Sequence, residues 1–190
     1  MYDSAAMLAA EKIFSPAPAD PLALIDDQRL RRFVRYWLDK RGPHIATRRA
    51  DIDPTEIPWI LPFIWLYDYE PEGRRLRCRL AGESIRETYP MNIVGMCLDE
   101  FLPANELPEI HAHYLSVLDG ASIGHARGRV YRPALAQGGY VERVILPLTD
   151  ESGLRVTMLI GATFYSLRSI ASPEALVAQT RSLIPVPLDA

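Results

Sequence analysis

The stretch 63-FIWLYDYEPEGRRLRCRLA-81 decides the fold. In its second half Leu76, Cys78 and Leu80 alternate with arginines, which predicts a strand with one apolar and one basic face. Its first half is dense in aromatic and β-branched residues, and 71-PEGR-74 supplies Pro and Gly between the two halves. The whole stretch therefore predicts a β-hairpin of two antiparallel strands.

Three more strand-like runs follow later in the chain. They are 123-IGHARGRVYR-132, 141-VERVILPL-148 and 155-RVTMLIGATFYS-166. The intervening segments 133-PALAQGG-139 and 149-TDESG-153 are rich in turn-forming residues. Such short connections favour antiparallel neighbours.

The region between the hairpin and these strands has a helical period. Apolar residues recur three and four apart at Leu107, Ile110, Tyr114, Val117 and Leu118, and Asp119-Gly120 is typical of a helix end. Shorter helices are expected at 83-ESIRETY-89 and 98-LDEFL-102. The order is thus two strands, several helices and three strands, which predicts an α+β domain.

Four segments resemble a bacterial family of short, stand-alone PAS-like proteins. They are 51-DIDPTEIPWILPFIWLYDYE-70, 78-CRLAGESIRETYPMNIVGMCLDEFLP-103, 142-ERVILPLTDESG-153 and 158-MLIGATF-164. The resemblance covers roughly Asp27 to Ser166. It implies a five-stranded antiparallel sheet of order 2-1-5-4-3, with helices on one face around a small apolar pocket. It also implies a sensory or protein-interaction role in bacterial signal transduction. The fold alone does not define which activity the domain has.

The resemblance leaves the cofactor open. PAS domains bind haem, flavin, small organic molecules or nothing, so haem or a small organic ligand is allowed and none is required. The run 95-GMCLDEFLP-103 lacks the Asn-Cys-Arg-Phe-Leu-Gln-like pattern of flavin light sensors. A photoactive flavin adduct is therefore not expected, and Cys97 is interpreted as a small buried residue.

The pocket is expected to take its polar groups from the helical segment and the central strand. The candidate residues are Trp65, Glu83, Tyr89, His111, Tyr114 and Arg143. Arg143 would suit a carboxylate if it faces the pocket, whereas Trp59, Trp65, Phe101 and Tyr114 would close the pocket if they fill it. His111 is expected near the buried stripe and His113 at its edge. Because residues two apart on a helix diverge, they cannot bind one metal ion together, and His125 is expected on a strand surface.

Residues Asp27 to Arg41 predict an amphipathic helix that flanks the domain. Its apolar stripe consists of Leu30, Phe33, Val34, Trp37 and Leu38, while six basic residues cover the remaining surface. The stripe is a candidate interface for a second copy or a signalling partner, and the alternative is that it packs on its own domain. The acidic pI of about 5.8 and the absence of a reader motif argue against nucleic acid.

Length and composition predict one domain with two extensions. The 190 residues divide into an N-terminal extension with a Pro-rich linker (1–26), the PAS-like domain with its flanking helix (27–168) and a tail (169–190). The tail suggests one more short helix. The longest uncharged apolar stretch, 57-IPWILPFIWLY-67, is too short for a bilayer. With two cysteines and no basic leader, the cytoplasm is the expected location.

The sequence contains none of the common linear catalytic motifs. It lacks Gly-x-Ser-x-Gly, Gly-x-Gly-x-x-Gly, Gly-x-x-x-x-Gly-Lys and His-Glu-x-x-His, and the spacing of its cysteines does not predict a zinc site. A non-catalytic protein is therefore expected. The alternative is an isomerase-like or hydrolase-like enzyme that uses one carboxylate in an apolar pocket, which no linear pattern would reveal.

Overall fold

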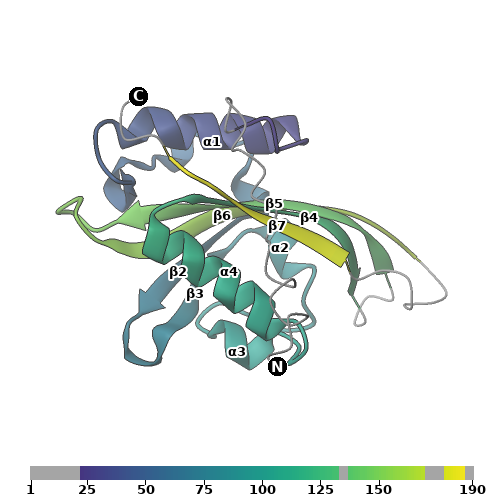
Figure 1. Ribbon diagram of the computed structural model, residues 1–190. Coiled ribbons are helices and arrows are strands. Elements are labelled where there is room, and N and C mark those ends of the chain that lie inside the picture. The colour runs from purple at the N-terminus through teal and green to yellow at the C-terminus, as the bar shows by residue number, and fades with distance from the viewer. Residues whose placement is uncertain (1–21, 133–136, 170–177, 187–190) are drawn as a thin grey trace, which may run out of the picture.

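The computed structural model describes residues 22–132, 137–169 and 178–186, and its strands form one sheet (Figure 1). The strands are β1 (Thr47–Arg48), β2 (Ile64–Glu70), β3 (Arg75–Ala81), β4 (Ile123–Arg132), β5 (Gln137–Thr149), β6 (Val156–Ser169) and β7 (Ala178–Ile184). The helices are α1 (Gln28–Arg41), α2 (Glu83–Arg86), α3 (Leu98–Phe101) and α4 (Leu107–Gly120). The strand order is β3-β2-β6-β5-β4-β7, and β1 pairs with β5 in parallel.

The hairpin and the three later strands form as predicted. β2 pairs antiparallel with β3, and β5 pairs antiparallel with both β4 and β6. β6 also pairs antiparallel with β2, the first strand of the hairpin, since Ile64 to Asp68 lie opposite Ala162 to Met158. The first five long strands therefore have the order 2-1-5-4-3, which confirms the predicted α+β sheet.

The C-terminal tail differs from the prediction of a short helix. Ala178–Ile184 forms β7, which extends the sheet at the edge of β4, with Ile123 opposite Ile184 and Arg129 opposite Ala178. An edge strand offers unpaired backbone N–H and C=O groups, and β7 satisfies those of β4. Residues 170–177 and 187–190 lie outside the described residues, as do residues 1–21 of the predicted N-terminal extension.

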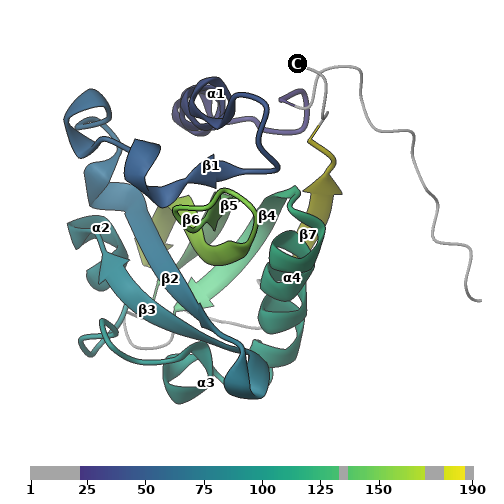
Figure 2. The ribbon, with the colours of Figure 1, turned by 90° about the vertical axis from the view of Figure 1, so that its left-hand side faces the viewer.

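Helix α1 forms where the amphipathic pattern predicts it. The Asp27 side chain caps its N-terminus by accepting hydrogen bonds from the backbone N–H groups of Arg29 and Leu30. Gly42 ends the helix with a φ of 56°, a conformation that favours glycine. The helix lies across one face of the sheet, opposite to α2, α3 and α4 (Figure 2).

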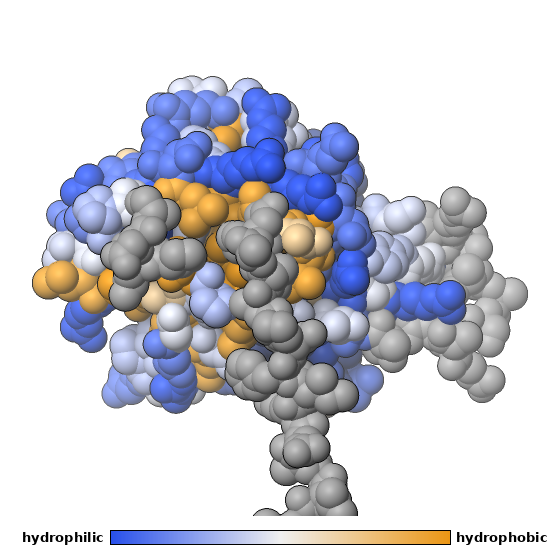
Figure 3. Space-filling view, turned by 45° about the horizontal axis from the view of Figure 1, so that its top comes forward, coloured by the Kyte–Doolittle hydropathy of each residue, from blue (hydrophilic) through white to orange (hydrophobic). Residues whose placement is uncertain are grey.

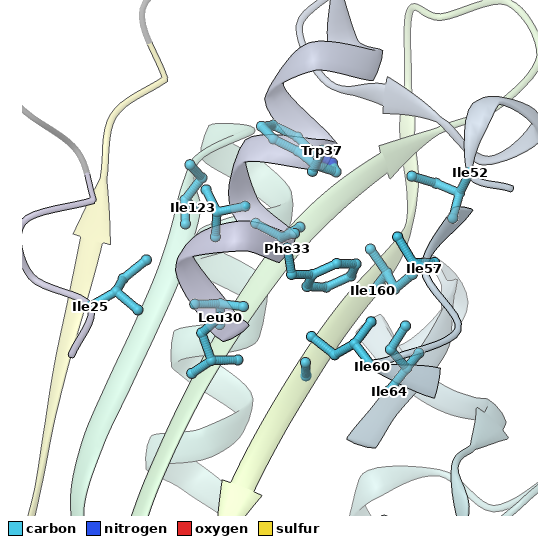
Figure 4. Packing of buried hydrophobic residues seen from close by; sticks show 14 of the residues in the cluster. Ile25, Leu30, Phe33, Trp37, Ile52, Ile57, Ile60, Ile64, Ile123 and Ile160 are labelled. Carbon is cyan, nitrogen blue, oxygen red and sulfur yellow. The ribbon is translucent and has the colours of Figure 1, made fainter. Parts of the chain in front are cut away.

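The α1 side of the sheet holds a large hydrophobic core. Leu30, Phe33 and Trp37 are fully buried there, and Figure 4 shows them pointing toward the sheet and toward isoleucines of the segment 49–63. This segment consists of short 3₁₀ turns that precede β2. The sheet is thus covered on both faces within the chain.

The second core lies between the sheet and the helices α2 to α4. Its buried members include Trp65, Tyr67, Leu76, Cys78, Ile85, Ile93, Leu98, Ile110, Tyr114, Val117, Ile145 and Leu159. Successive side chains of a strand point to opposite faces. Consequently Val144 contributes to the α1 core, whereas Ile145 contributes to the helix-side core.

Within the described residues, no helix has both the length and the apolar character needed to cross a membrane.

Candidate functional site

An aromatic cluster lies where the sequence predicts the ligand pocket. The rings of Trp65 and Tyr114 are stacked, with centroids 5.3 Å apart and planes 7° apart. Tyr67 lies 5.0 Å from the Trp65 ring and 6.0 Å from the Tyr114 ring. All three residues are buried, and burial raises the pKa of Tyr67 well above its usual value. These rings fill space between β2 and α4.

Trp65 is fixed by contacts with β6. Its Nε1 donates a hydrogen bond to Thr163 Oγ1 at 2.8 Å, and both residues are buried. Its ring also lies directly over Gly161, because a Cβ added there would come within 2.1 Å of Trp65 Cζ2. Only glycine allows this close approach, so the position of the indole depends on residue 161.

Arg143 faces this aromatic cluster from β5. Its side chain is buried, and Nη1 lies 3.5 Å from the Tyr114 hydroxyl, at the long end of a hydrogen bond. The guanidinium therefore reaches the helix side of the sheet, where a planar cation can bind a carboxylate. Arg143 and Tyr114 also take part in interactions beyond this contact.

Two further polar candidates, Glu83 and Tyr89, lie at the margin of the cluster. Glu83 is exposed at the start of α2, so it does not point into a closed cavity. Tyr89 is half-buried, and its ring meets Phe101 edge to face at 5.3 Å. Trp59 was expected beside Trp65, but it packs against the α1 core on the opposite face.

The burial of the two histidines of α4 is the reverse of the prediction. His111 is partly exposed, and its Nε2 lies 2.8 Å from the carbonyl oxygen of Arg74. His113 is buried, and its Nε2 lies 3.1 Å from the carbonyl oxygen of Ser182 in β7. Desolvation lowers the pKa of His113 to about 4, so the ring is neutral at pH 7 and Nε2 donates. The prediction failed because β7, which buries His113, was expected to be a helix.

A polar cluster that the sequence did not predict anchors the start of α1. Glu142 accepts hydrogen bonds from the backbone N–H groups of Asp26 and Asp27 at 2.7 and 2.8 Å. It also lies 2.8 Å from His125 Nε2, and Arg127 forms an ion pair with Asp26 at 2.5 Å. His125 is buried, which corrects its expected surface position. The period of two along β4 and β5 is the signal that places His125, Arg127 and Glu142 on one face.

The carboxylate of Glu142 is stabilised in its charged form. Burial raises its pKa, but hydrogen bonds from His125 and from the two backbone N–H groups outweigh this effect and lower the pKa below its ordinary value. Its negative charge also lies near the N-terminus of α1, where the helix dipole favours it. Glu142 therefore acts as an anchor for α1 and is poorly suited to accept a proton.

The predicted interface stripe is not accessible on the surface. Leu30, Phe33, Val34 and Trp37 are fully buried against the chain's own sheet, and Leu38 is partly buried beside them. In addition, Trp37 Nε1 donates to the carbonyl oxygen of Pro147 at 3.0 Å. This corrects the interpretation of the stripe as a partner surface, because an amphipathic pattern does not reveal which apolar surface covers it.

Two hollows are present near the ends of α1. One, of about 320 Å³, is lined by Asp26, Asp27, Arg29, Tyr140, Glu142, Phe164, Tyr165 and Ser166. The other, of about 350 Å³, is lined by Asp39, Lys40, Arg41, Gly42, Pro43, His44, Arg48 and Asp51. Neither hollow is lined by any of the six predicted pocket residues.

No group of three or more His, Cys, Asp or Glu side chains within the described residues is arranged to hold a metal ion. Cys78 and Cys97 are buried free thiols, and burial raises the pKa of Cys78 to about 11 and the pKa of Cys97 above its usual value. Neither thiol is therefore poised as a nucleophile.

Comparisons with known proteins support the family that the four sequence segments suggest. The family model described as PAS domain matches residues 25–163, so this chain belongs to the PAS domain family. A solved structure, the PAS domain of a protein from Colwellia psychrerythraea, is similar with a TM-score of 0.39 and 12% sequence identity. That match covers 61% of this chain and 95% of the other. No curated protein matches the chain.

Proposed function

We propose that this protein is a non-catalytic PAS module that transmits a signal by binding a partner protein or a second copy. PAS domains are generally sensory or signalling modules, and they are typically non-catalytic. The observation that carries the proposal is the stack of Trp65 on Tyr114, which lies on the side of the sheet where the family resemblance implies a ligand pocket. A module with a filled interior can act through its surface.

The state of Glu142 supports a binding role over the enzyme alternative. A one-carboxylate isomerase or hydrolase needs a base that can take up a proton near neutral pH. Glu142 is the buried carboxylate among the described residues, and its pKa is lowered because hydrogen bonds saturate it. Its chemistry thus fits a structural anchor.

A ligand-gated sensor is the second candidate, and the position of Arg143 favours it. The buried guanidinium and the Tyr114 hydroxyl approach each other on the helix side of the sheet. A small carboxylate that displaced the aromatic packing could bind Arg143 by two parallel hydrogen bonds. Such a ligand would act by favouring a conformation in which Trp65 and Tyr114 separate.

Native mass spectrometry of the full chain, compared with its denatured mass, tests both candidates. A bare monomer or homodimer supports the interaction module. A non-covalent adduct that is lost in the variant Arg143→Met supports the carboxylate sensor and overturns the module proposal. The variant Arg155→Met, which changes an exposed arginine on the β5–β6 turn, is the matched control and should retain the adduct.

A further inference from the structure

The exposed side of α1 carries two arginines, Arg32 and Arg35. Residues 28, 32, 35 and 39 are spaced by four, three and four, so they form one outward ridge, and all four are exposed. Figure 3 shows hydrophilic side chains gathered across the upper part of the molecule, where α1 lies. Since the opposite side of α1 is buried in the core, this ridge is the part of the helix that a partner can reach.

Arg32 and Arg35 differ from several other arginines of the chain in their pairing. Within the described residues, neither lies in ion-pair contact with a carboxylate. In contrast, carboxylate partners are present for Arg29, Arg48, Arg74, Arg75, Arg77, Arg79, Arg127 and Arg181. Two neighbouring cations on one ridge thus have unused capacity for hydrogen bonds to an anion.

Aromatic rings hold the cations in place along one side of the helix. Arg32 lies over the Trp59 ring at 4.3 Å, Arg29 over Phe164 at 3.6 Å, and Lys40 lies 5.5 Å from the Tyr36 ring. Figure 2 shows the segment 49–63, which carries Trp59, beside α1 on the side away from α4. A guanidinium stacked on a ring is oriented before binding, so less side-chain entropy is lost when its edge binds a carboxylate.

Apolar surface adjoins Arg32 through the Trp59 ring beneath its guanidinium. Leu61 is exposed, and Trp59 is only partly buried, so the segment beside Arg32 offers apolar contact area as well as charge. Arginine and tryptophan side by side are the composition that protein interfaces favour at their centres. The surface formed by Arg32, Arg35, Trp59 and Leu61 is called the arginine seam below.

Charges around the seam favour a short acidic segment over a polyanion. Asp39 lies on the same ridge one turn after Arg35, and Asp53 and Glu56 are exposed on the neighbouring turns. A nucleic acid or an anionic membrane would meet these carboxylates with its own charges, which is unfavourable. A peptide can place acidic residues at the arginines and avoid the carboxylates.

We infer that the arginine seam is a docking surface for an acidic segment of a partner protein. The inference rests on the proposed interaction role and names the chemistry of the partner. Carboxylates of the segment bind Arg32 and Arg35, while an apolar residue of the segment contacts Trp59 and Leu61. This surface replaces the buried stripe of α1 as the place where a partner meets the helix.

The test measures binding of a probe peptide to the full chain. The probe is a fluorescein-labelled dodecapeptide of Glu, Asp and Leu, and its fluorescence anisotropy is followed at low and at high salt. Saturable binding is expected, with an affinity about tenfold or more lower in the double variant R32E/R35E. The double variant R86E/R155E changes the net charge equally at exposed sites elsewhere, and it should bind almost as the natural chain does.

A conservative variant and two other probes complete the test. Arg32→Lys keeps the charge but loses the planar stack, so its affinity should fall by a factor of about three. Equal losses in both double variants, or failure of the peptide to bind, would overturn the inference. The inference would also be overturned if a dT12 oligonucleotide or phosphatidylglycerol vesicles bound more tightly than the peptide and lost this binding in R32E/R35E.

Failure of the inference and failure of the proposed function give different results. If the peptide does not bind while native mass spectrometry shows a chain without a ligand, the seam is wrong and the interaction module stands. If a small-molecule adduct that is lost in Arg143→Met is found, the module proposal itself fails, whatever the peptide does.

Discussion

His125 Nε2 and a carboxylate oxygen of Glu142 lie 2.8 Å apart beneath the first residues of α1, and both side chains are buried. The same carboxylate accepts the backbone N–H groups of Asp26 and Asp27, which belong to the chain entering the helix. The pairing of β4 with β5 thus positions the Glu142 side chain, which binds the backbone at the N-terminus of α1. This relationship links the central sheet to the helix that covers its outer face.

The substitution Glu142→Gln should loosen the N-terminus of α1. The amide has nearly the same shape, but it lacks the charge and turns one acceptor into a donor facing N–H groups. A loss of about 1 to 3 kcal/mol in the free energy of unfolding is expected, measured by urea denaturation. Amide hydrogen exchange should accelerate at residues 26–31, whereas Glu87→Gln, at an exposed position, should change neither quantity. Unchanged exchange at residues 26–31 would contradict the anchoring role.

The stability of the protein should depend on pH through His113. Its pKa is about 4 in the folded chain and near 6.5 when unfolded, so the unfolded state binds the proton more readily between these values. The contribution of neutral His113 to the free energy of unfolding is therefore fully present above pH 6.5. It falls by about 2 to 3 kcal/mol as the pH drops toward 4.

Urea denaturation at several pH values between 4 and 7 measures this dependence. His113→Gln retains an N–H donor for the carbonyl of Ser182 but does not titrate, so its profile should be flatter than that of the natural chain. The difference between the two profiles isolates His113 from the carboxylates, which contribute at lower pH. Parallel profiles would show that His113 does not cause the dependence.

Gly161→Ala should destabilise the protein through Trp65. The added methyl group would overlap the indole and the carbonyl oxygen of Val144, so the strand or the ring must shift. A cost of about 1 to 3 kcal/mol is expected, as for other overpacked cores. Gly120→Ala, where the added methyl carbon would lie 3.6 Å from the Ser122 hydroxyl, serves as a control with room for the methyl group.

A double-mutant cycle separates the two contributions of Gly161. In the background Trp65→Leu the indole is absent, so Gly161→Ala should cost less there than in the natural chain. The part of the cost that persists reports the contact with Val144. If the cost is the same in both backgrounds, the indole is not what requires glycine at position 161.

The substitutions Phe33→Ser and Trp37→Ser should unfold the protein more easily and leave its subunit number unchanged. Both side chains are fully buried in the α1 core, and truncation of a buried aromatic residue costs about 3 to 5 kcal/mol. Thermal denaturation measures the loss, and size-exclusion chromatography below the transition measures the subunit number. Loss of a dimer without a change in melting temperature would instead restore the stripe as an interface.

The sequence by itself determined the helices and the five long strands from α1 to β6, and their order. The alternation at Leu76 and Cys78 predicts β3, the period of Leu107 to Leu118 predicts α4, and Asp27 with Gly42 marks the ends of α1. These signals are local, because helix capping and the side-chain period of a helix or strand involve residues only a few positions apart. The family segments added the strand order, which the pairing of β2 with β6 confirms.

Only the tertiary structure decided which surfaces meet. The apolar stripe of α1 could cover a partner or its own sheet, and the fold places Phe33 in the chain's own core. The tail became β7 because the edge of β4 supplied hydrogen-bond partners, and β7 in turn buried His113. Glu142 and His125 are 17 residues apart, and only the β4–β5 pairing brings them together. Contacts between distant segments depend on the packing of the whole chain, which no local pattern encodes.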